Sequence, residues 1–115
     1  MSMKRSEIWL VDLNPTRGAE MQKIRPAVIV NNDAIGILPL KVIVPITEWN
    51  DWHKTKPWMV RVNPDSANGL SKPSSVDTFQ IRSVSQDRFV KKLGELPEAA
   101  MQGINQAISL VLNIK

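Results

Sequence analysis

The 115-residue sequence contains no cysteine, which excludes disulfide bonds and cysteine-ligated zinc and makes the reducing cytoplasm its expected setting. It has a single histidine, His53, and no cluster of carboxylates, so we expect neither a metal site nor another cofactor. No apolar run approaches the length of a membrane span, and residues 1–7 lack the apolar core of a signal peptide. We therefore expect no association with membranes.

The scarce residue types also exclude several kinds of catalysis. A single histidine rules out RNA cleavage by a pair of histidines, and no nucleophile elbow indicates a serine-histidine-carboxylate triad. Glycine-rich phosphate loops are absent as well. The net charge of +4 and the isoelectric point of about 9.7 favour polyanionic partners only weakly, since basic domains without such partners are equally common.

Residues 1–115 are expected to form a single domain, because a chain of this length buries one core without metal or disulfide support. Apolar stretches between glycine and proline turns predict strands at 7–13, 26–30, 40–47, 58–62, 75–81 and, after a tight turn at 85–88, one ending at Gly94. Apolar residues at helical spacing predict one amphipathic helix over 97–113. The predicted fold is mainly β, a strongly bent sheet or small, partly open barrel with helical additions.

The stretch from Arg25 to Val30 is the one around which we expect the fold to be organised. Val28, Ile29 and Val30 are typical of a strand buried on both faces. Pro26 cannot donate a ladder hydrogen bond, so it belongs at the first residue of the strand or on an edge. Arg25 thus lies where a polar loop meets rigid sheet. It is either an ordinary surface cation or a side chain held still for function.

Thr47 ends the next predicted strand, after Pro45, which argues for a bulge or an edge there. An arginine and a hydroxyl at the ends of neighbouring strands can clamp a phosphate and stabilise its developing charge. RNA carries its own nucleophile, the 2′-hydroxyl. The pair Arg25 and Thr47 is therefore a candidate site for RNA cleavage.

Five segments, in order and in one register, resemble the MazF/PemK (Kid) family of toxin endoribonucleases of type II toxin–antitoxin systems. They are Trp9 to Glu20, Arg25 to Val30, Val44 to Thr47, Gln80 to Ser83, and Lys92 to Leu96. Each segment is weak by itself, but together they span nearly the whole chain.

The resemblance implies an SH3-like barrel, usually a homodimer, that cleaves single-stranded RNA without metal and is neutralised by an antitoxin. The 2′-hydroxyl attacks the phosphate and leaves a 2′,3′-cyclic phosphate and a 5′-hydroxyl. The family's catalytic arginine and threonine fall on Arg25 and Thr47, and a frequently important glutamate falls on Glu20. Because the pKa of arginine lies above about 12, we expect Arg25 to act first as a transition-state clamp and only second as general acid or base. Glu20 either positions Arg25 or the RNA, or is a solvated loop charge.

Further candidates for RNA binding lie in three regions. The first turn offers Asn14 and Arg17, and the predicted strand 75–81 offers Ser75, Asp77 and Gln80. The predicted exposed loop 48–57 interleaves aromatic rings with cations, the combination that holds unpaired bases and their backbone; its candidates are Trp49, Trp52, His53, Lys54 and Lys56. The alternative is that these tryptophans pack beneath the loop or at a dimer interface, and we expect Trp58 to pack.

Two other functions remain open. The chain is either the endoribonuclease or a binding toxin on the same barrel, like the CcdB toxins that poison DNA gyrase, which need no arginine–threonine pair. A third alternative is a catalytically silent nucleic-acid-binding module. Salt-dependent RNA affinity without cleavage would support it. The sequence does not give the RNA target or the antitoxin.

Overall fold

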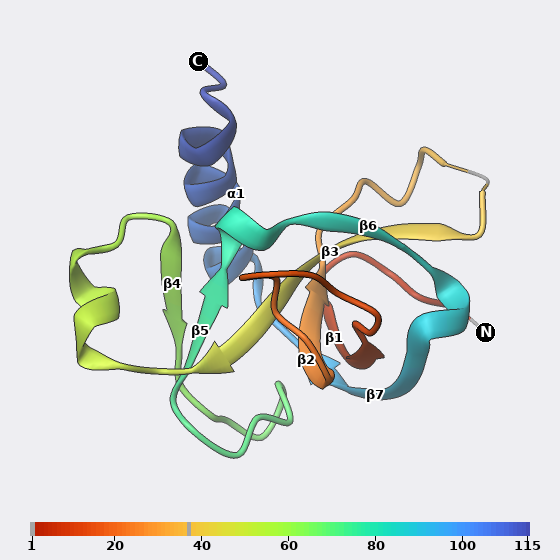
Figure 1. The fold of residues 1–115 in the computed structure, drawn as a ribbon, viewed down its shortest axis with the longest axis horizontal. Coiled ribbons are helices and arrows are strands. Elements are labelled where there is room, and N and C mark those ends of the chain that lie inside the picture. Colours follow the sequence, from red (N-terminus) through yellow and green to blue (C-terminus); the bar gives the residue numbers. More distant parts are fainter. Residues whose placement is uncertain (1, 37) are drawn as a thin grey trace.

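Seven strands and one long helix make up the fold in the computed structural model, which describes residues 2–36 and 38–115 (Figure 1). In chain order the elements are β1 (Glu7–Asp12), β2 (Ile24–Ile29), β3 (Leu40–Glu48), the 3-10 helix η1 (Asp51–Thr55), β4 (Met59–Val62), β5 (Ser74–Asp77), the 3-10 turn η2 (Thr78–Gln80), β6 (Arg82–Ser85), the 3-10 turn η3 (Gln86–Arg88), β7 (Phe89–Glu95) and α1 (Glu98–Leu112).

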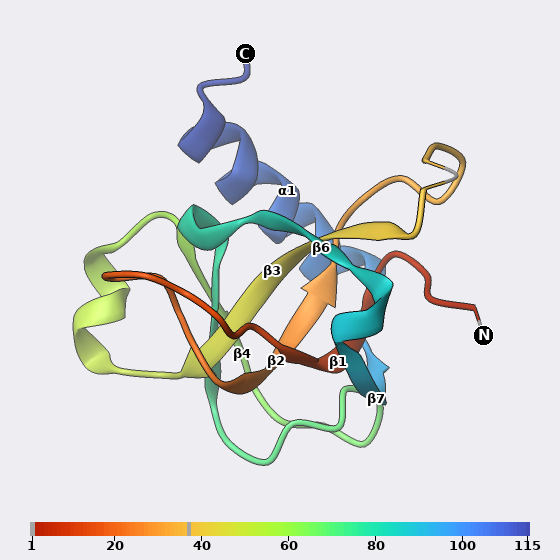
Figure 2. The same ribbon diagram turned by 45° about the vertical axis from the view of Figure 1, so that its right-hand side comes forward.

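All strand pairs are antiparallel, in the order β4-β5-β3-β2-β1-β7, with β6 also paired to β3. The long strand β3 is shared between two parts of the sheet. Its first half pairs with β6 and β2, and its last three residues pair with β5. The sheet therefore bends along β3, as Figures 1 and 2 show, without closing completely. This confirms the predicted mainly β fold of bent antiparallel strands.

Two hydrophobic clusters form on opposite faces of the bent sheet. Val28 and Val30 enter one cluster, together with Met101 and Ile104 of α1, whereas Ile29 enters the other beside Trp9. Neighbouring residues of a strand point to opposite faces, so β2 is buried on both sides, as predicted. The helix covers the first cluster (Figure 2), which confirms the amphipathic pattern. Among the described residues, no helix has the length and apolarity needed to span a bilayer.

Two predicted elements were wrong in part. The strand expected over 75–81 ends at Asp77, because the Asp77 carboxylate accepts a hydrogen bond from the Phe79 N–H at 3.1 Å and starts the turn η2. The loop expected over 48–57 contains the helix η1, which begins with reciprocal hydrogen bonds between Asn50 and His53. His53, expected on an exposed loop, is 5% exposed.

Two glycines let the connection 63–73 lie directly against β7. A Cβ atom on Gly94 would lie 2.2 Å from the carbonyl oxygen of Ala67, and one on Gly69 would lie 2.2 Å from that of Leu93. Gly69 also has a φ of +70°, which favours glycine. This contact brings the connection next to the ends of β2 and β3.

We expect Gly94→Ala to lower the free energy of unfolding by about 2 kcal/mol or more, because a backbone carbonyl must shift to admit the methyl group. Gly103→Ala is the matched control. It lies within α1, where the nearest atom to an added Cβ is 4.0 Å away. That variant should be more stable than wild type by up to about 1 kcal/mol. Urea titration of both variants measures the difference, and equal effects would contradict it.

Glu7 is a buried carboxylate that joins β1 to β7. Its Oε1 accepts hydrogen bonds from the backbone N–H of Lys4 and from the indole N–H of Trp9, both at 3.0 Å, and its Oε2 lies 3.1 Å from Nζ of Lys92. Burial by itself raises the pKa of Glu7, but these donors and the lysine charge outweigh burial, so the pKa lies below its usual value. The ionised form is therefore stabilised by folding.

Because the pKa of Glu7 is lower in the folded state, its contribution to stability is present above the unfolded pKa and is lost as the pH falls through the folded pKa. We expect Glu7→Gln to lower stability at pH 7 by about 2 kcal/mol and to reduce the loss on acidification below the unfolded pKa. Thermal melting across pH measures both effects. Glu95→Gln, which removes an exposed carboxylate opposite Glu7, should keep the wild-type acid dependence; the same change in both variants would contradict the assignment.

Candidate active site

The end of the β2–β3 ladder places Arg25 opposite Thr47. The last paired residues are Ala27 and Pro45. The same register continued would pair Pro26 with Ile46 and then Arg25 with Thr47. Residues opposite one another in an antiparallel ladder point to the same face. This register therefore puts the Arg25 guanidinium and the Thr47 hydroxyl on the same side of the sheet.

Pro26 explains why the ladder stops there. The N–H of Val30 donates to the carbonyl of Val42 on β3 at 2.9 Å, so every second residue back along β2 turns its N–H toward β3. Pro26 occupies such a position and has no N–H to donate. It pairs with Leu10 of β1 only. We expected Pro26 to be the first residue of its strand or to lie on an edge. β2 instead begins two residues earlier and lies between β3 and β1, but Pro26 itself has no partner on β3.

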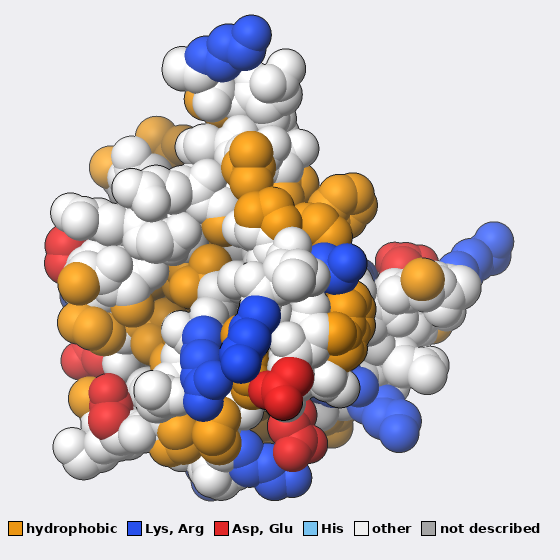
Figure 3. Space-filling model, turned by 90° about the vertical axis from the view of Figure 1, so that its left-hand side faces the viewer, with side chains coloured by type: hydrophobic (Ala, Val, Ile, Leu, Met, Phe, Trp, Pro, Cys, Tyr) orange, Lys and Arg blue, Asp and Glu red, His pale blue; other side chains and the backbone are white. Residues whose placement is uncertain are grey.

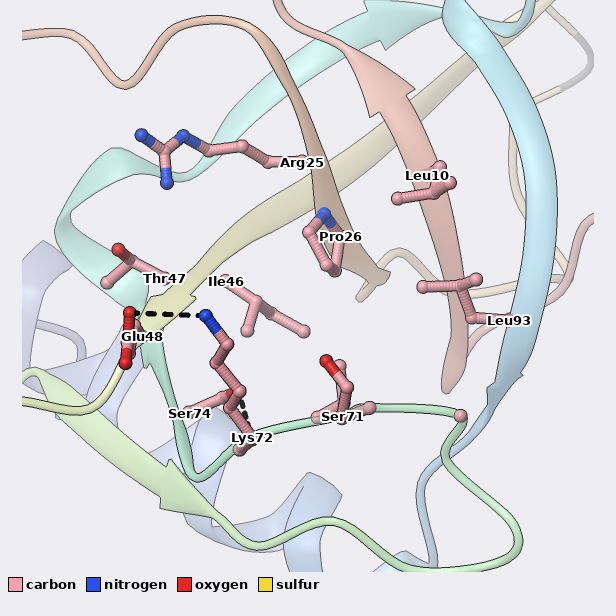
Figure 4. Close-up of a pocket in the computed structure, with 12 residues that line it drawn as sticks. Leu10, Arg25, Pro26, Ile46, Thr47, Glu48, Ser71, Lys72, Ser74 and Leu93 are labelled. Atoms are coloured by element: carbon pink, nitrogen blue, oxygen red, sulfur yellow. Dashed lines mark hydrogen bonds and ion pairs between the residues drawn. The ribbon is translucent and has the colours of Figure 1, made fainter.

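Beyond this point β3 leaves β2 and pairs with β5, beginning at Ile46. The two strands part and leave a hollow of about 360 Å³ (Figure 4). Its apolar lining includes Ile46, Leu70 and Leu93, and polar groups including Arg25 and Thr47 surround it. A mostly apolar concavity with a few polar groups is the usual form of a ligand site.

Arg25 is held by its own loop. Its Nε donates to the backbone carbonyl of Gln22 at 2.8 Å, which leaves the terminal nitrogens for another partner. Figure 4 draws the guanidinium and the Thr47 hydroxyl on the same side of the hollow. Two parallel N–H donors match the oxygens of a phosphate. This arrangement can bind an anion between β2 and β3.

Lys72 and Glu48 lie on the same rim and were not among the predicted site residues. Lys72 Nζ is 3.8 Å from Glu48 Oε2, and both side chains are about two-thirds exposed, so the ion pair contributes little to stability (Figure 4). Lys72 comes from the connection 63–73, which has no periodic pattern in the sequence. The close approach of this connection to β7 at Gly69 and Gly94 brings Lys72 to the site, and no sequence signal predicts that contact.

The loop between β1 and β2 is anchored at its base. Asn14 Oδ1 accepts a hydrogen bond from the Lys23 N–H at 3.1 Å, and the Leu13 N–H donates to the Lys23 carbonyl at 3.0 Å. Arg88 donates to the carbonyls of Asp12, at 3.1 Å, and Asn14. The exposed Asn14 is thus committed to closing the loop that carries Arg25 at its end.

A second set of contacts holds the far side of this loop. Gln80 Oε1 accepts a hydrogen bond from the Met21 N–H at 2.5 Å, and its Nε2 donates to Asp77 Oδ2 at 3.4 Å. Glu20 accepts from the Arg17 N–H at 2.8 Å and is exposed, as is Arg17. Within the described residues Glu20 forms no ion pair with Arg25. Glu20 and Gln80 instead line a second hollow of about 310 Å³ beside the first.

Three predicted RNA-binding residues lie inside the protein. Ser75 is fully buried, and His53 and Asp77 are each 5% exposed. His53 Nδ1 lies 2.7 Å from Ser75 Oγ and accepts from the Asn50 N–H at 3.2 Å. Burial raises the pKa of Asp77 despite hydrogen bonds from Phe79 and Gln80. In this structure these residues support η1 and η2 and line neither hollow.

The aromatic residues of the predicted loop divide into packed and exposed ones. Trp49 is half-buried, with the Arg61 guanidinium 4.7 Å above its ring. Trp52 is 55% exposed and has Lys56 Nζ 5.4 Å from its centroid; Lys54 is exposed too. Figure 3, which looks onto the left-hand side of Figure 1, shows lysine and arginine side chains gathered among hydrophobic surface. Among the described residues, no cluster of three histidine or carboxylate side chains is arranged to hold a metal ion.

The sequence is similar to that of known toxins over nearly its whole length. A model of the family described as PemK-like, MazF-like toxin of type II toxin-antitoxin system matches residues 4–112. The chain belongs to this family. MazF9, an endoribonuclease of Mycobacterium tuberculosis, is 31% identical over 97% of this chain and 98% of its own length. The endoribonuclease PemK of Escherichia coli is 33% identical, over 96% of this chain and 82% of its own length.

Solved structures share the fold of this PemK/MazF family member. A MazF crystal structure from Deinococcus radiodurans superposes with a TM-score of 0.80 at 21% identity, covering 97% of both chains. An endoribonuclease from a mycobacterial species, solved in complex with its cognate antitoxin, gives a TM-score of 0.78 at 24% identity and covers 99% of this chain and 98% of its own. At these identities the likeness confirms the barrel-like fold alone.

We expect Gln80→Ala to release the loop that carries Arg25. Loss of the acceptor for the Met21 N–H should cost about 1 kcal/mol locally, which corresponds to about fivefold faster amide hydrogen exchange at Met21. Gln22→Ala, which removes an exposed amide from the same loop, should leave this exchange unchanged. Equal protection of Met21 in both variants would show that Gln80 does not hold the loop.

Proposed function

We propose that the protein is a toxin endoribonuclease that cleaves single-stranded RNA at Arg25 and Thr47 and is neutralised by a cognate antitoxin. The observation that carries this proposal is the opposition of the two side chains across the parted end of the β2–β3 ladder. Membership of the PemK/MazF toxin family supports it, as do relatives named endoribonucleases.

The reaction needs no nucleophile from the protein. The 2′-oxygen of the RNA bonds to phosphorus as the bond from phosphorus to the 5′-oxygen breaks. One fragment ends in a 2′,3′-cyclic phosphate and the other begins with a 5′-hydroxyl. The 2′-hydroxyl loses a proton and the leaving 5′-oxygen gains one, so the charge balances. No metal ion is required if a fixed cation stabilises the pentacoordinate phosphorus.

Arg25 supplies that cation in the proposed mechanism. Its Nε is engaged by the Gln22 carbonyl, so the terminal N–H groups face the phosphate oxygens as a fork. Positive charge directed at oxygens that gain charge in the transition state lowers the barrier more than it stabilises the substrate. Thr47 donates its hydroxyl to the same phosphate. Proton transfer by Arg25 is the secondary possibility.

The RNA strand runs over the surface formed by the β1–β2 loop and η1. Arg17, Lys54 and Lys56 are positioned to neutralise phosphates, and Trp52 offers an exposed ring to a base. Glu20 and Gln80 border the second hollow, where they contact RNA or hold the loop in place. Trp49, His53, Ser75 and Asp77 act beneath this surface as its support, and Asn14 acts by closing the loop.

The proposed biological unit is a homodimer of single-domain chains, each formed by residues 1–115. The structure of a mycobacterial endoribonuclease with its cognate antitoxin supports an antitoxin partner here as well. The cytoplasm is the proposed compartment because the substrate RNA is made and translated there.

The test is cleavage of a long single-stranded RNA in EDTA, with identification of the product ends. Wild type should give cyclic phosphate and 5′-hydroxyl ends. Arg25→Ala should lower the cleavage rate by about 10²- to 10³-fold, since it removes the charge that faces the transition state. Arg25→Lys should recover only part of the rate, because an ammonium group lacks the planar fork. Thr47→Val should lose activity and Thr47→Ser retain it.

Lys91→Ala, which removes an exposed cation from β7 outside the hollow, is the control and should cleave as wild type does. Circular dichroism must show that every variant is folded. No cleavage of varied RNAs by folded wild-type protein would refute the proposal, and so would full activity of Arg25→Ala.

A further inference from the structure

A partly exposed row of aromatic rings continues from η1 to η2, outside the catalytic hollow. Trp52 and Phe79 are exposed, and Trp58 between them is half-buried. We call Trp52, Lys56, Trp58 and Phe79 the aromatic row. Lys56 Nζ lies 5.4 Å from the ring centroid of Trp52 and 5.9 Å from that of Trp58. The Trp58 and Phe79 rings meet edge to face at 5.9 Å. One cation is thus shared by two indoles, and Phe79 forms the end of the row.

Phe79 is 66% exposed, although it is fixed at both sides. Its backbone N–H donates to the Asp77 carboxylate, and its ring meets Trp58. Leaving most of a phenylalanine ring in water forfeits favourable burial of apolar surface. An exposed aromatic ring that is held rigid loses little conformational entropy on binding, which suits it to recognise a flat partner. The structure around Phe79 therefore points to a ligand.

The second hollow lies between Phe79 and the catalytic pair. Phe79, Pro45 and Arg82 all line it. Pro45 and Thr47 are two residues apart on β3, so their side chains point to the same face and lie about 7 Å apart along the strand. The second hollow thus adjoins the catalytic pair on the face of the sheet that Pro45 and Thr47 share.

We propose that the second hollow binds an unpaired nucleobase of the RNA, adjacent to the cleaved phosphate, and that this base stacks on Phe79. The inference rests on the proposed RNA-cleaving function and assigns a substrate subsite to it. Arg82, which lines the same hollow, and Lys56, which lies over the Trp58 ring, neutralise the flanking phosphates. The Gln80 amide and the Glu20 carboxylate lie at the edge of the hollow, where the polar edge of a base faces them.

The chemistry of the hollow favours a base over an acidic peptide segment. Glu20 carries negative charge at the rim and repels acidic side chains, whereas it accepts hydrogen bonds from the amino group of a base. Interleaved rings and cations are the usual means of holding single strands, because every base has a face that stacks. A surface of this kind binds many sequences and adds affinity rather than strict specificity.

The experiment measures binding without cleavage, so that it remains informative even if the cleavage proposal fails. The probe is a short fluorescein-labelled RNA with 2′-deoxyribose at the mapped cut, or a random-sequence RNA pool if no cut is found. Fluorescence anisotropy should show that Phe79→Ala binds about tenfold more weakly than wild type. Phe79→Tyr should bind as wild type, while Phe79→Leu, which is apolar but not aromatic, should bind as weakly as Phe79→Ala.

An abasic nucleotide moved along the probe locates the base. At one position adjacent to the cut it should weaken binding to wild type and have no further effect on Phe79→Ala. Val90→Ala, which truncates an exposed apolar residue on β7, is the control and should bind as wild type. Because the Phe79 side chain is mostly exposed, we expect its variants to melt close to the wild-type temperature.

Wild-type RNA affinity in Phe79→Ala would overturn the inference, and so would equal binding by Phe79→Leu and wild type. Unchanged RNA affinity together with weaker inhibition by the cognate antitoxin would assign the aromatic row to that protein instead. Absence of cleavage by wild type, with RNA binding that still depends on Phe79, would refute the nuclease and leave the base subsite standing.

Discussion

The N–H group that Pro26 lacks is the constraint on which the site depends. Along β2 the alternate N–H groups face β3, and the one at position 26 is absent. The ladder therefore ends at Ala27 and Pro45, and beyond them β3 is paired only on its other edge, with β5. Arg25 and Thr47 fall just beyond the break, where both line the hollow without being closed over by backbone pairing. A ladder continued to Arg25 would occupy the space that now forms the hollow.

Rigidity on both sides of this break comes from different sources. Behind it, β2 is buried in two hydrophobic clusters, which fix the strand that carries Arg25. In front, Met21 of the loop 14–23 packs against a hydrophobic cluster, and individual hydrogen bonds hold the rest of the loop. Arg88 donates to it, and Asn14 and Gln80 accept from its N–H groups. Packed cores resist small displacements, whereas single hydrogen bonds each contribute only about 1 kcal/mol. The candidate site thus combines an arginine on a fixed strand with a loop held by weaker contacts, which suits the proposed binding of an RNA strand.

Local sequence rules were enough to predict most of the strands, the C-terminal helix and the interruption of strand pairing at Pro26, because apolar period and proline chemistry act over a few residues. They failed where a side chain replaced a backbone partner. Asp77 caps η2 and ends β5 early, and His53 closes η1 and is buried, although the surrounding sequence reads as polar loop. Lys72 and Phe79 escaped prediction for another reason: their placement depends on long-range contacts, a glycine approach to β7 and an edge-to-face contact with Trp58.

The use of the only histidine supports the assignment of the proposed chemistry to an arginine. The Asn50 N–H and the Ser75 hydroxyl both meet His53 Nδ1, so the imidazole serves as an internal acceptor beneath the Trp-rich surface. It does not line either hollow. What lines the hollow where we propose the phosphate reacts is a permanent cation and a hydroxyl, groups suited to stabilising charge rather than to relaying protons at neutral pH. A substrate with its own internal nucleophile is the one for which such a site suffices, and RNA has that property.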